Sequence, residues 1–598
     1  MSKQVLWMAI LIGMNITTVV QAQQRGAHEL DSIANSVFTT DSRGTRAVTA
    51  PLKMSLKSSD VLAKGSLTNR EAFYIYNSTG DAGRFVIVSG DQRMPAILGY
   101  SDKGNFDINN IPDGLKWFLQ KCEAEASLMA NNPTWTRATD TQDSSNVFPT
   151  VEPLLGNRAW GQDAPFNQQC PTINGLHAKT GCVATALAQI MAYYRYPATY
   201  DWDKMPDSYN GDYTPEQADA VAQLMHDIGE ASEMHYGASV SMTGDFNAES
   251  ALLNSQFDYD DNVRLIKKDF YTEEKWMQML INELREGRPI FYDGMNEHQM
   301  NAHAFILDGI NSEGYFHVNW GWNGDYNGYF LLHSLAYDYT NELGVPQRKD
   351  YSYFSDALIY IHPNDSITEN EPTNIISDSI KVQSGMGMFP RNTTIELSIF
   401  NFMNIRNIPF KGERQLLLVD NETDTLIAPL GKANSMKNEL LTGGYYTTAL
   451  KIKGTLPTDL PDGSYRIYAG VRQNGYEKWG RIKALIQNED QIRDHLLLIL
   501  KDGYYTLGTG QIPDGIKTHT AERKWITIYQ SQKNLQLTPN IPLAEWNLIN
   551  INGSIVTQGK NASQSETICI NTSLPTGIYL LRGMEEDGRI YVTKFVKR

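Results

Sequence analysis

Cysteine is scarce in this chain of 598 residues, which contains four cysteines spread far apart. Small domains held together by disulfides carry many closely spaced cysteines, and zinc sites commonly use Cys-x-x-Cys pairs. Neither pattern occurs here. The sequence therefore predicts neither a disulfide scaffold nor a zinc site, and each cysteine is either a small buried apolar residue or a reactive thiol.

Positive charge is also in short supply. The chain has 52 Lys and Arg against 68 Asp and Glu, a net charge of -16, and no long basic run. Nucleic acids and anionic membrane surfaces attract proteins with concentrated positive charge. The composition therefore argues against both as partners.

Long apolar runs are absent except near the N-terminus, where "VLWMAILIGM" follows the positively charged "MSK". The next residues, "VVQAQQ", offer a small residue for cleavage after Ala22. This arrangement is typical of an export signal over residues 1–22. A transmembrane anchor is the alternative, but Asn15 and Thr17 interrupt a run that would need roughly 20 apolar residues to span a bilayer. We therefore expect a secreted or cell-surface protein.

The chain is long enough for about three to five domains. Turn-bounded strand patterns and one helical pattern predict an α/β segment over residues 23–148, ending in a polar linker. Residues 149–362 mix helical and strand patterns and contain the candidate chemistry. Alternating strands then predict a β-sandwich over 363–520 and a last β domain over 521–598. The fold class is an α+β domain preceded by an α/β segment and followed by all-β domains.

One helical stripe in the N-terminal segment explains the first cysteine. The stretch "IPDGLKWFLQKCEAEASLMA" places Leu115, Phe118, Leu119 and Cys122 on one face of a helix. Cys122 is therefore interpreted as a buried apolar residue, and an inert buried thiol is also the interpretation of Cys170.

Cys182 is different, because it stands at the start of a helix. In "KTGCVATALAQIMAYYRYP" the apolar residues recur at helical spacing and Pro197 ends the pattern. The unpaired N–H groups and the positive end of the helix dipole favour a thiolate there. A buried cysteine in a packed helix is the alternative interpretation of Cys182.

A thiolate nucleophile needs a base that titrates near neutral pH, most often histidine. The chain has 11 histidines, and His303 in "NAHAFILDGI" begins an apolar strand. Alternation places His303, Phe305 and Leu307 on one face of that strand. His298, five residues earlier, is expected to be non-catalytic, and "EHQMNAH" does not match the zinc-protease pattern HExxH.

Further polar residues complete a possible site. Asn319, in "YFHVNWGWNGDYNGYFLLH", can orient an imidazole by accepting its second N–H, and Trp320 can shield that bond from water. The carboxamide of Gln162, in "WGQDAPFN", has the chemistry of an oxyanion donor. Each of these residues alone would be unremarkable. Together, the order Gln, Gly-Cys, His, Asn-Trp-Gly is that of papain-type thiol proteases.

Six ordered segments, among them "WGQDAPFN", "KTGCVATALAQIMAYYRYP", "AHAFILDGI" and "YFHVNWGWNGDYNGYF", resemble the streptopain family and its interpain-type relatives in Bacteroidetes. The upstream stretch over about 70–125 looks like the inhibitory propeptide of that family. The resemblance implies a papain-like catalytic domain and secretion as a zymogen. It also implies protein or peptide substrates, the chain's own propeptide as an inhibitor, and no cofactor or metal.

Carried over to this chain, the resemblance makes Cys182 the nucleophile and His303 the general base. It makes Gln162 the oxyanion-hole side chain, together with the backbone N–H of Cys182. Asn319 and Trp320 are supporting candidates, because in this family backbone around the Asn-Trp pair can hold the histidine instead of the Asn side chain.

The final hairpin, "LPTGIYLLR…GRIYVTKFVKR", resembles the sorting domain that directs cargo through the type IX secretion system of Bacteroidetes, which would make the secretion machinery a partner. It also fits the last hairpin of a β-sandwich. Two other functions stay open at this point: a thiol acyltransferase of transglutaminase type using the same residues, and a surface adhesin whose protease-like domain is only a scaffold.

Overall fold

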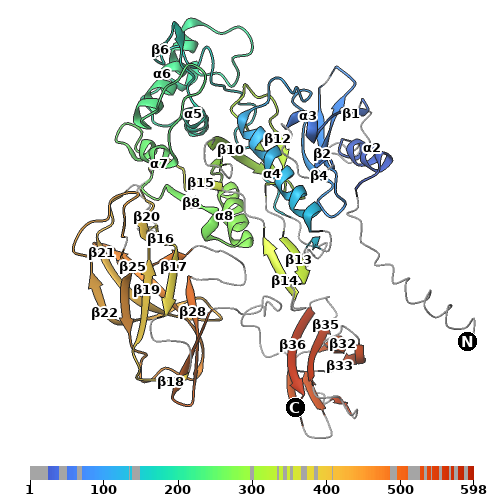
Figure 1. Ribbon diagram of the computed structural model, residues 1–598, viewed down its shortest axis with the longest axis vertical. Coiled ribbons are helices and arrows are strands. Elements are labelled where there is room, and N and C mark those ends of the chain that lie inside the picture. Colours follow the sequence, from blue (N-terminus) through green and yellow to red (C-terminus); the bar gives the residue numbers. More distant parts are fainter. Residues whose placement is uncertain are drawn as a thin grey trace, which may run out of the picture. The chain divides into compact units, whose positions relative to one another are not determined.

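The structure is a computed structural model of the chain (Figure 1). Its described residues form two compact units, residues 1–419 with 426–510 and residues 420–425 with 511–598, and each is treated separately. No helix in the described residues is long and apolar enough to cross a membrane. The expected export signal over 1–22 lies outside them. The described ranges are 24–38, 50–62, 70–81, 83–132, 135–137, 148–295, 302–332, 336–340, 346–350, 355–364, 374–382, 388–406, 408–446, 448–484, 494–509, 526–530, 535–539, 542–550, 555–563, 568–570, 577–584 and 590–597.

A ten-stranded antiparallel sheet organises the first unit, with strand order β1-β2-β3-β4-β12-β11-β10-β9-β15-β8. Strands of the N-terminal segment form one end of this sheet and strands of the predicted catalytic domain form the other. They meet where β4 pairs with β12, aligning Gly99 with Phe330 and Tyr100 with Tyr329. The two segments therefore share one sheet. The strands are β1 (Leu52–Lys57), β2 (Phe73–Ser78), β3 (Phe85–Ser89), β4 (Ile97–Ser101), β8 (Arg264–Lys267), β9 (Ile290–Met295), β10 (Ala302–Ile310), β11 (Phe316–Asn319), β12 (Gly328–Phe330) and β15 (Ser355–Ile359).

The two faces of the sheet bury two different cores, because successive side chains of a strand point to opposite faces. On β10, Phe305 and Leu307 join the core built with α4 and α8, as the sequence predicted. Ala304 and Ile306 join the core built with α5, α6 and α7. Figure 1 shows α4 in blue and α8 in green beside β10. The helices are α2 (Ala27–Ser36), α3 (Ser58–Val61), α4 (Asp113–Asn131), α5 (Cys182–Tyr194), α6 (Pro215–Ala231), α7 (Asp245–Leu253) and α8 (Glu273–Arg285), with single 3-10 turns at Trp202–Lys204 and Lys268–Phe270.

The predicted stripe on α4 is confirmed. Leu115, Phe118 and Leu119 are fully buried and Cys122 is 2% exposed. Part of the expected linker over 131–148 is not irregular, however. Strand β5 (Thr136–Arg137) pairs with β13 (Ala336–Thr340), which also pairs with β14 (Pro346–Asp350). A partner about 200 residues away cannot be read from local polarity, so the composition alone indicated a loop.

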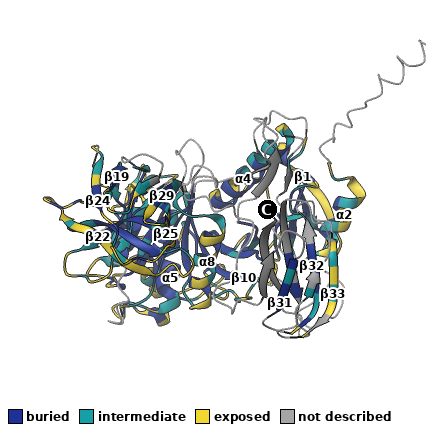
Figure 2. Cartoon of the chain, turned by 90° about the horizontal axis from the view of Figure 1, so that it is seen from below, coloured by how far each residue is buried: buried dark blue, intermediate teal, exposed yellow. Residues whose placement is uncertain are grey.

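The rest of the first unit is a β-sandwich around a separate core. Its strands form a seven-stranded, a four-stranded and a three-stranded sheet. In Figure 2 the central strand β25 is drawn as buried, whereas the outer strand β22 is mostly exposed. The strands are β16 (Ile375–Ser377), β17 (Ser379–Val382), β18 (Met388–Pro390), β19 (Ile395–Phe400), β20 (Phe402–Asn404), β21 (Gly412–Asp420), β22 (Leu426–Ser435), β23 (Tyr445–Tyr446), β24 (Leu450–Gly454), β25 (Gly463–Gln473), β26 (Gly480–Arg481), β27 (Lys483–Ala484), β28 (His495–Lys501) and β29 (Tyr504–Thr509).

The second unit is a small β domain. Strand β35 pairs with β36 from Gly577↔Lys597 to Met584↔Ile590, so the final hairpin forms where the sequence predicted it. The unit begins at Gln511, ten residues before the expected start at 521. Its strands are β30 (Ile526–Gln530), β31 (Leu535–Pro539), β32 (Leu543–Asn550), β33 (Ile555–Ala562), β34 (Ile568–Ile570), β35 (Gly577–Met584) and β36 (Ile590–Lys597).

Candidate active site

Cys182 is the first residue of α5, as predicted. The residue before it, Gly181, has φ +86°, and an added Cβ would lie 2.9 Å from the Met234 side chain. Both the left-handed backbone and the lack of space require glycine there. The helix start is then fixed from within, because the Thr185 hydroxyl donates to the Gly181 carbonyl oxygen over 3.0 Å. The sequence "TGC" thus holds the thiol at the end of a helix, where N–H groups are free to face it.

The segment of Gln162 is fastened to this cysteine turn. The Thr180 N–H donates to the Gln162 carbonyl oxygen over 3.2 Å. Lys179 and Asp163 form an ion pair between the same two segments. The turn that contains the cysteine and the half-buried Gln162 are therefore neighbours, although twenty residues separate them in the sequence.

His303 lies at the beginning of β10, aligned with Gly294 of β9. The ring is half-buried, and its Nδ1 lies 3.9 Å from Asp113 Oδ2, at the first turn of α4. Burial lowers the pKa of His303, the Asp113 carboxylate opposes that effect, and Lys116 adds to it. The base candidate thus faces a residue of the N-terminal segment, and within the described residues no hydrogen bond joins it to Cys182.

The start of α4 packs directly on the aromatic residues of the site. Trp320 is 4% exposed, and its ring centroid lies 4.8 Å from that of Phe305. An added Cβ at Gly114 would lie 2.9 Å from Trp320 Cε3 and 3.1 Å from Phe305 Cδ1, so only glycine allows this approach. The Trp320 indole N–H donates to the Tyr326 carbonyl oxygen over 3.1 Å. Trp320 is therefore a fixed, buried platform beneath α4.

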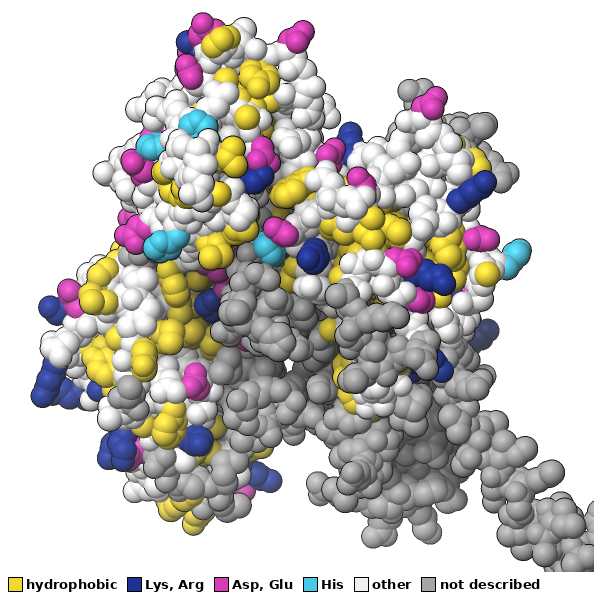
Figure 3. Space-filling view, turned by 45° about the horizontal axis from the view of Figure 1, so that its top comes forward, with side chains coloured by type: hydrophobic (Ala, Val, Ile, Leu, Met, Phe, Trp, Pro, Cys, Tyr) yellow, Lys and Arg dark blue, Asp and Glu magenta, His cyan; other side chains and the backbone are white. Residues whose placement is uncertain are grey.

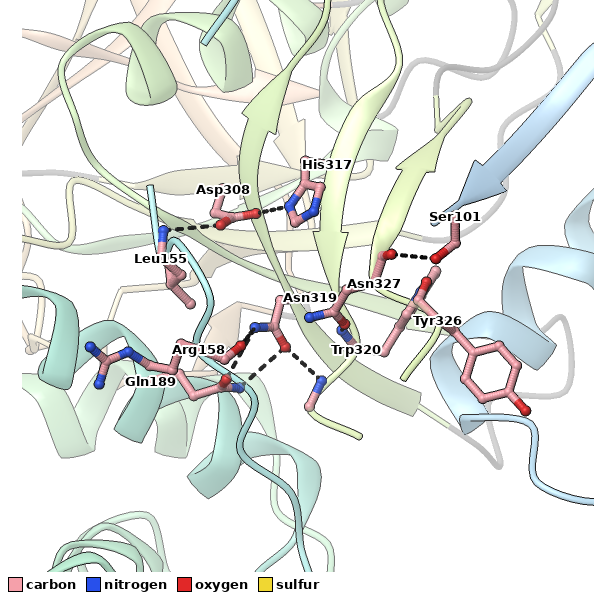
Figure 4. Close-up of polar contacts among 11 residues, drawn as sticks. Ser101, Leu155, Arg158, Gln189, Asp308, His317, Asn319, Trp320, Tyr326 and Asn327 are labelled. Carbon is pink, nitrogen blue, oxygen red and sulfur yellow. Dashed lines mark hydrogen bonds and ion pairs between the residues drawn. The ribbon is translucent and has the colours of Figure 1, made fainter. Parts of the chain in front are cut away.

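Asn319 is buried, and its side chain is fully used by other partners (Figure 4). Its amide donates to the Arg158 carbonyl oxygen over 3.0 Å and to Gln189 Oε1 over 3.1 Å. Its Oδ1 accepts the Gly321 N–H over 2.9 Å. Gln189 belongs to α5, so Asn319 ties that helix to β11. Because its polar atoms are taken up by these bonds, the Asn319 side chain does not orient the His303 imidazole in this state.

The thiol of Cys182 is protonated in this arrangement. Burial raises its pKa to about 11, and the carboxylate of Asp293 raises it further. The backbone N–H groups of Ala304 and Val183 lower the pKa of Cys182, but by less than burial raises it. The helix start was predicted to favour a thiolate. Desolvation outweighs that contribution here: protein atoms surround the sulfur, although the residue is partly exposed, and an ionised sulfur loses hydration there.

Three acidic residues near the site were not predicted. Asp293 of β9 is 4% exposed, and burial raises its pKa well above the usual range, with a further raising effect from the neighbouring carboxyl group of Asp245 on α7. Burial likewise raises the pKa of Asp356 on β15 to about 7, opposed by an ion pair with Lys267. Asp113 is the third missed residue. The "IPDGL" stretch marked a helix start, but nothing local linked it to His303.

Metal-binding clusters of three or more His, Cys, Asp or Glu do not occur among the residues that the structure describes. The described cysteines 122, 170 and 182 are free thiols. Cys170 is 3% exposed, as the sequence predicted for an inert thiol, and burial raises its pKa to about 11.

Comparison with known proteins gives the family of the chain. The peptidase C10 family model matches residues 160–200 and 197–330, and the Spi protease inhibitor model matches residues 26–126. The chain belongs to the peptidase C10 family of cysteine peptidases. Streptopain from Streptococcus pyogenes is 31% identical over 307 residues, which cover 44% of this chain and 74% of streptopain. The inhibitor-like region precedes the peptidase region, as in a zymogen.

Other similar proteins match different shares of the chain. The thiol protease/hemagglutinin PrtT from Porphyromonas gingivalis is 28% identical over 451 residues, 68% of this chain and 49% of that protein. The chain thus spans about half the length of PrtT. A prointerpain A fragment from Prevotella intermedia is 28% identical, covering 50% of this chain and 98% of the fragment with a TM-score of 0.41. The active interpain A protease is 32% identical, covering 36% and 96%, with a TM-score of 0.30.

Proposed function

We propose that the chain is an exported cysteine endopeptidase in its latent form, with Cys182 as nucleophile and His303 as general base. The observation that carries this proposal is the position of Cys182. Cys182 packs against the core that contains Ala304, the residue that follows His303, and the Ala304 N–H lowers the pKa of the thiol. The helix start with the sulfur and the strand start with the imidazole are therefore adjacent, and a rotation of the histidine side chain brings base and nucleophile into reach.

In the active form, His303 takes the proton of Cys182, and the thiolate attacks the carbonyl carbon of a substrate peptide bond. The Cys182 N–H and the Gln162 carboxamide stabilise the negative charge that develops on the carbonyl oxygen. His303 then gives its proton to the leaving amine, which breaks the C–N bond. Water, activated by the same histidine, hydrolyses the thioester and restores the thiol.

Asn319 and Trp320 are positioning residues in this proposal. Asn319 binds Gln189 of α5 and the backbone of Gly321, so it holds the nucleophile helix against the loop that follows β11. Trp320 covers Phe305, which shares the strand face of His303. Both residues fix the two elements that carry the reacting groups without touching the sulfur.

Latency follows from the contacts of α4. Asp113 stands beside the imidazole, and Gly114 seats the helix on Trp320 and Phe305. A histidine engaged there is not free to deprotonate Cys182, whose raised pKa keeps the thiol inert at neutral pH. We infer that the segment over 23–148 is the inhibitory propeptide and that cleavage near 131–150 releases it. The expected export signal and sorting hairpin would place the enzyme outside the cell.

The test is a time course of intact mass under reducing conditions, with the parent chain and its Cys182→Ala variant, alone and mixed with a trace of active material. We expect the parent to cut itself between about 131 and 150, and the variant to be cut there only in trans. Persistent self-processing or peptidase activity in the variant would contradict the assignment of Cys182 as the nucleophile.

The two alternative functions give different readings in parallel assays. An acyltransferase would incorporate an added amine into protein faster than it hydrolyses peptides. An adhesin built on an inactive scaffold would resist labelling by an epoxide inhibitor of thiol proteases after removal of residues 23–148. The peptidase proposal expects hydrolysis to dominate and a single label on Cys182.

A further inference from the structure

The β-sandwich that follows the peptidase region contacts it through buried polar groups. The last strand in the order of the ten-stranded sheet is β8, at the end opposite to the N-terminal segment. When the edge of a sheet is buried, its backbone N–H and C=O groups need hydrogen-bond partners from the protein. Asn374, 3% exposed and directly before β16 of the sandwich, donates its side-chain amide to the Leu265 carbonyl oxygen of β8. The sandwich thus covers this edge.

A buried arginine makes the second contact. Arg406, in the loop after β20, is 5% exposed and donates to the Asp261 carbonyl oxygen. Its backbone is fixed by Asn404, whose Oδ1 accepts the Arg406 N–H over 3.1 Å. The carboxylate that compensates it most is Glu249 of α7, which is fully buried and raises the pKa of Arg406 against the lowering effect of burial. A charge at such a place is tolerated only when it is paired.

A third contact lies at the end of β27. The Lys483 ammonium donates to the Tyr271 hydroxyl over 2.6 Å and lies 4.8 Å from the centroid of that ring. The three contacts come from separate loops and strands of the sandwich, and they reach β8, the turn before β8 and the turn after β8. A flexible spacer would not use a fully buried carboxylate and a buried guanidinium to meet its neighbour.

Helix α7 connects this contact surface to the nucleophile. Its first residue, Asp245, is hydrogen-bonded to Asp293 on β9, and Asp293 is aligned with Ala304, the residue whose N–H meets the Cys182 thiol. One turn further along α7 is Glu249, whose charge favours the ionised form of Arg406. The sandwich therefore holds a helix whose other end supports the strand beside the active cysteine.

We propose that the β-sandwich over 375–509 is a permanent part of the mature peptidase, bound to α7 and β8 through Arg406 and Asn374. It stays attached when the propeptide leaves, and also when the chain is cut between 364 and 374. The inference concerns an interaction surface and goes beyond the proposed function. It does not depend on which residues perform the chemistry.

The experiment uses the full chain with Cys182→Ala, which cannot cut itself, and a recognition site for a specific protease inserted between 364 and 374. After cutting under native conditions, size-exclusion chromatography and intact mass show whether the two pieces elute together. We expect co-elution of the cut parent. Separate elution of the cut parent, at concentrations where the intact chain is monodisperse, would overturn the proposal.

Two variants locate the contact. Arg406→Ala should weaken the association of the cut pieces at least about 100-fold, because removing one partner strands a buried charge. Arg472→Ala is the matched control. It removes the 2.8 Å ion pair with Glu413 inside the sandwich, and we expect it to leave co-elution unchanged. If Arg406→Ala fails to fold, Asn374→Ala takes its place. Unchanged association in both would overturn the assignment of this surface.

The co-elution result is independent of the peptidase assignment, because every variant carries Cys182→Ala. A chain that proves inactive with natural Cys182 can still pass this test. Conversely, an active peptidase whose sandwich separates after the cut would refute only this inference.

Discussion

Helices α4 and α5 pack on opposite faces of one sheet, and each carries a free cysteine whose pKa is raised by burial. For Cys122, in the middle of α4, the pKa reaches about 12, with Lys121 and Glu125 acting in opposite directions. For Cys182, at the first position of α5, the pKa reaches about 11, although two further backbone N–H groups face the sulfur. Position at a helix start is therefore not sufficient for reactivity. The environment must also let the thiolate be solvated or paired.

The two thiols differ in whether a nearby group can accept the proton and stabilise the thiolate. Cys122 sits among the apolar residues of the core and has no described histidine partner. Cys182 has His303 one residue away from its N–H donor, Ala304, and the element that engages this histidine is α4 itself. The comparison predicts that departure of α4, which takes Cys122 with it, frees His303 and turns Cys182 into a nucleophile.

The largest expected effect comes from replacing each of the two cysteines, Cys182 and Cys122, with alanine in separate variants. Cys182→Ala should reduce peptidase activity of trans-matured enzyme by about 10⁴-fold or more, since the nucleophile and base act as a unit. Cys122→Ala changes the segment that is removed on maturation, so it should leave the activity after trans-maturation unchanged and lower the stability of the zymogen by about 1–2 kcal/mol through the small cavity it creates. Peptide hydrolysis and thermal unfolding measure the two effects. Equal losses of activity would erase the distinction between the helices.

The next effect tests the partner of the reactive thiol. His303→Ala in the trans-matured enzyme should lower kcat by about 10²–10⁴-fold, the usual range for loss of a general acid–base. His226→Ala on α6, where the ring is partly exposed and lies 3.5 Å from Asp227, is the control and should keep full activity. A His303→Ala enzyme with normal kcat would mean that another group activates Cys182.

Alkylation of the latent form tests the protonation state. Because the pKa of Cys182 is raised to about 11, the protonated thiol dominates at every pH below that value. The labelling rate of the zymogen should therefore rise about tenfold per pH unit, or about 100-fold from pH 8 to pH 10. The matured enzyme should instead react fast near neutral pH. A zymogen labelled equally fast at pH 7 and pH 10 contradicts the latent state described here.

The smallest effect concerns Asp113. Its carboxylate is half exposed, so its attraction for the His303 imidazole is screened by solvent. Asp113→Asn should accelerate self-processing up to about fivefold, measured as the rate of appearance of the mature mass. Glu123→Gln, on the same helix and not in contact with the site, should not change that rate. A slower Asp113→Asn zymogen would show that the contact assists maturation instead of delaying it.

Local patterns in the sequence predicted a large part of this structure. The start of α5 at Cys182, the stripe on α4 and the alternation of Ala304, Phe305 and Ile306 on β10 all follow from helical or strand periodicity. The resemblance to streptopain then predicted that Cys182, His303 and Gln162 form one site. These predictions depend on residues that are near each other in the chain or that match a known motif.

The remaining contacts join distant segments and leave no local signal. Asp113 and His303 are 190 residues apart in the sequence. Because an aspartate is common at a helix start, no local pattern indicated that Asp113 lies beside His303. Asn319 fits an imidazole-orienting residue by its motif, yet its side chain bonds to Gln189 and to the Arg158 backbone. The pairing of β4 with β12 is equally non-local. The distribution of charge was easier to predict, because the sequence has no long basic run. On the face seen in Figure 3, Lys and Arg side chains are dispersed among acidic ones.

The shared sheet has a consequence for how the mature enzyme comes into being. Phe330 of β12 lies over Gly99 of β4, where an added Cβ would be 2.4 Å from the ring. Strands β1 to β4 belong to the segment that we propose is removed on maturation, so the catalytic half of the sheet has this neighbour only in the zymogen. After maturation that neighbour is gone. A mature chain that unfolds must then close its sheet unaided, and its persistence depends on the rate of unfolding more than on an equilibrium. Cleavage of the propeptide therefore works as a one-way step in the folding history of the protein.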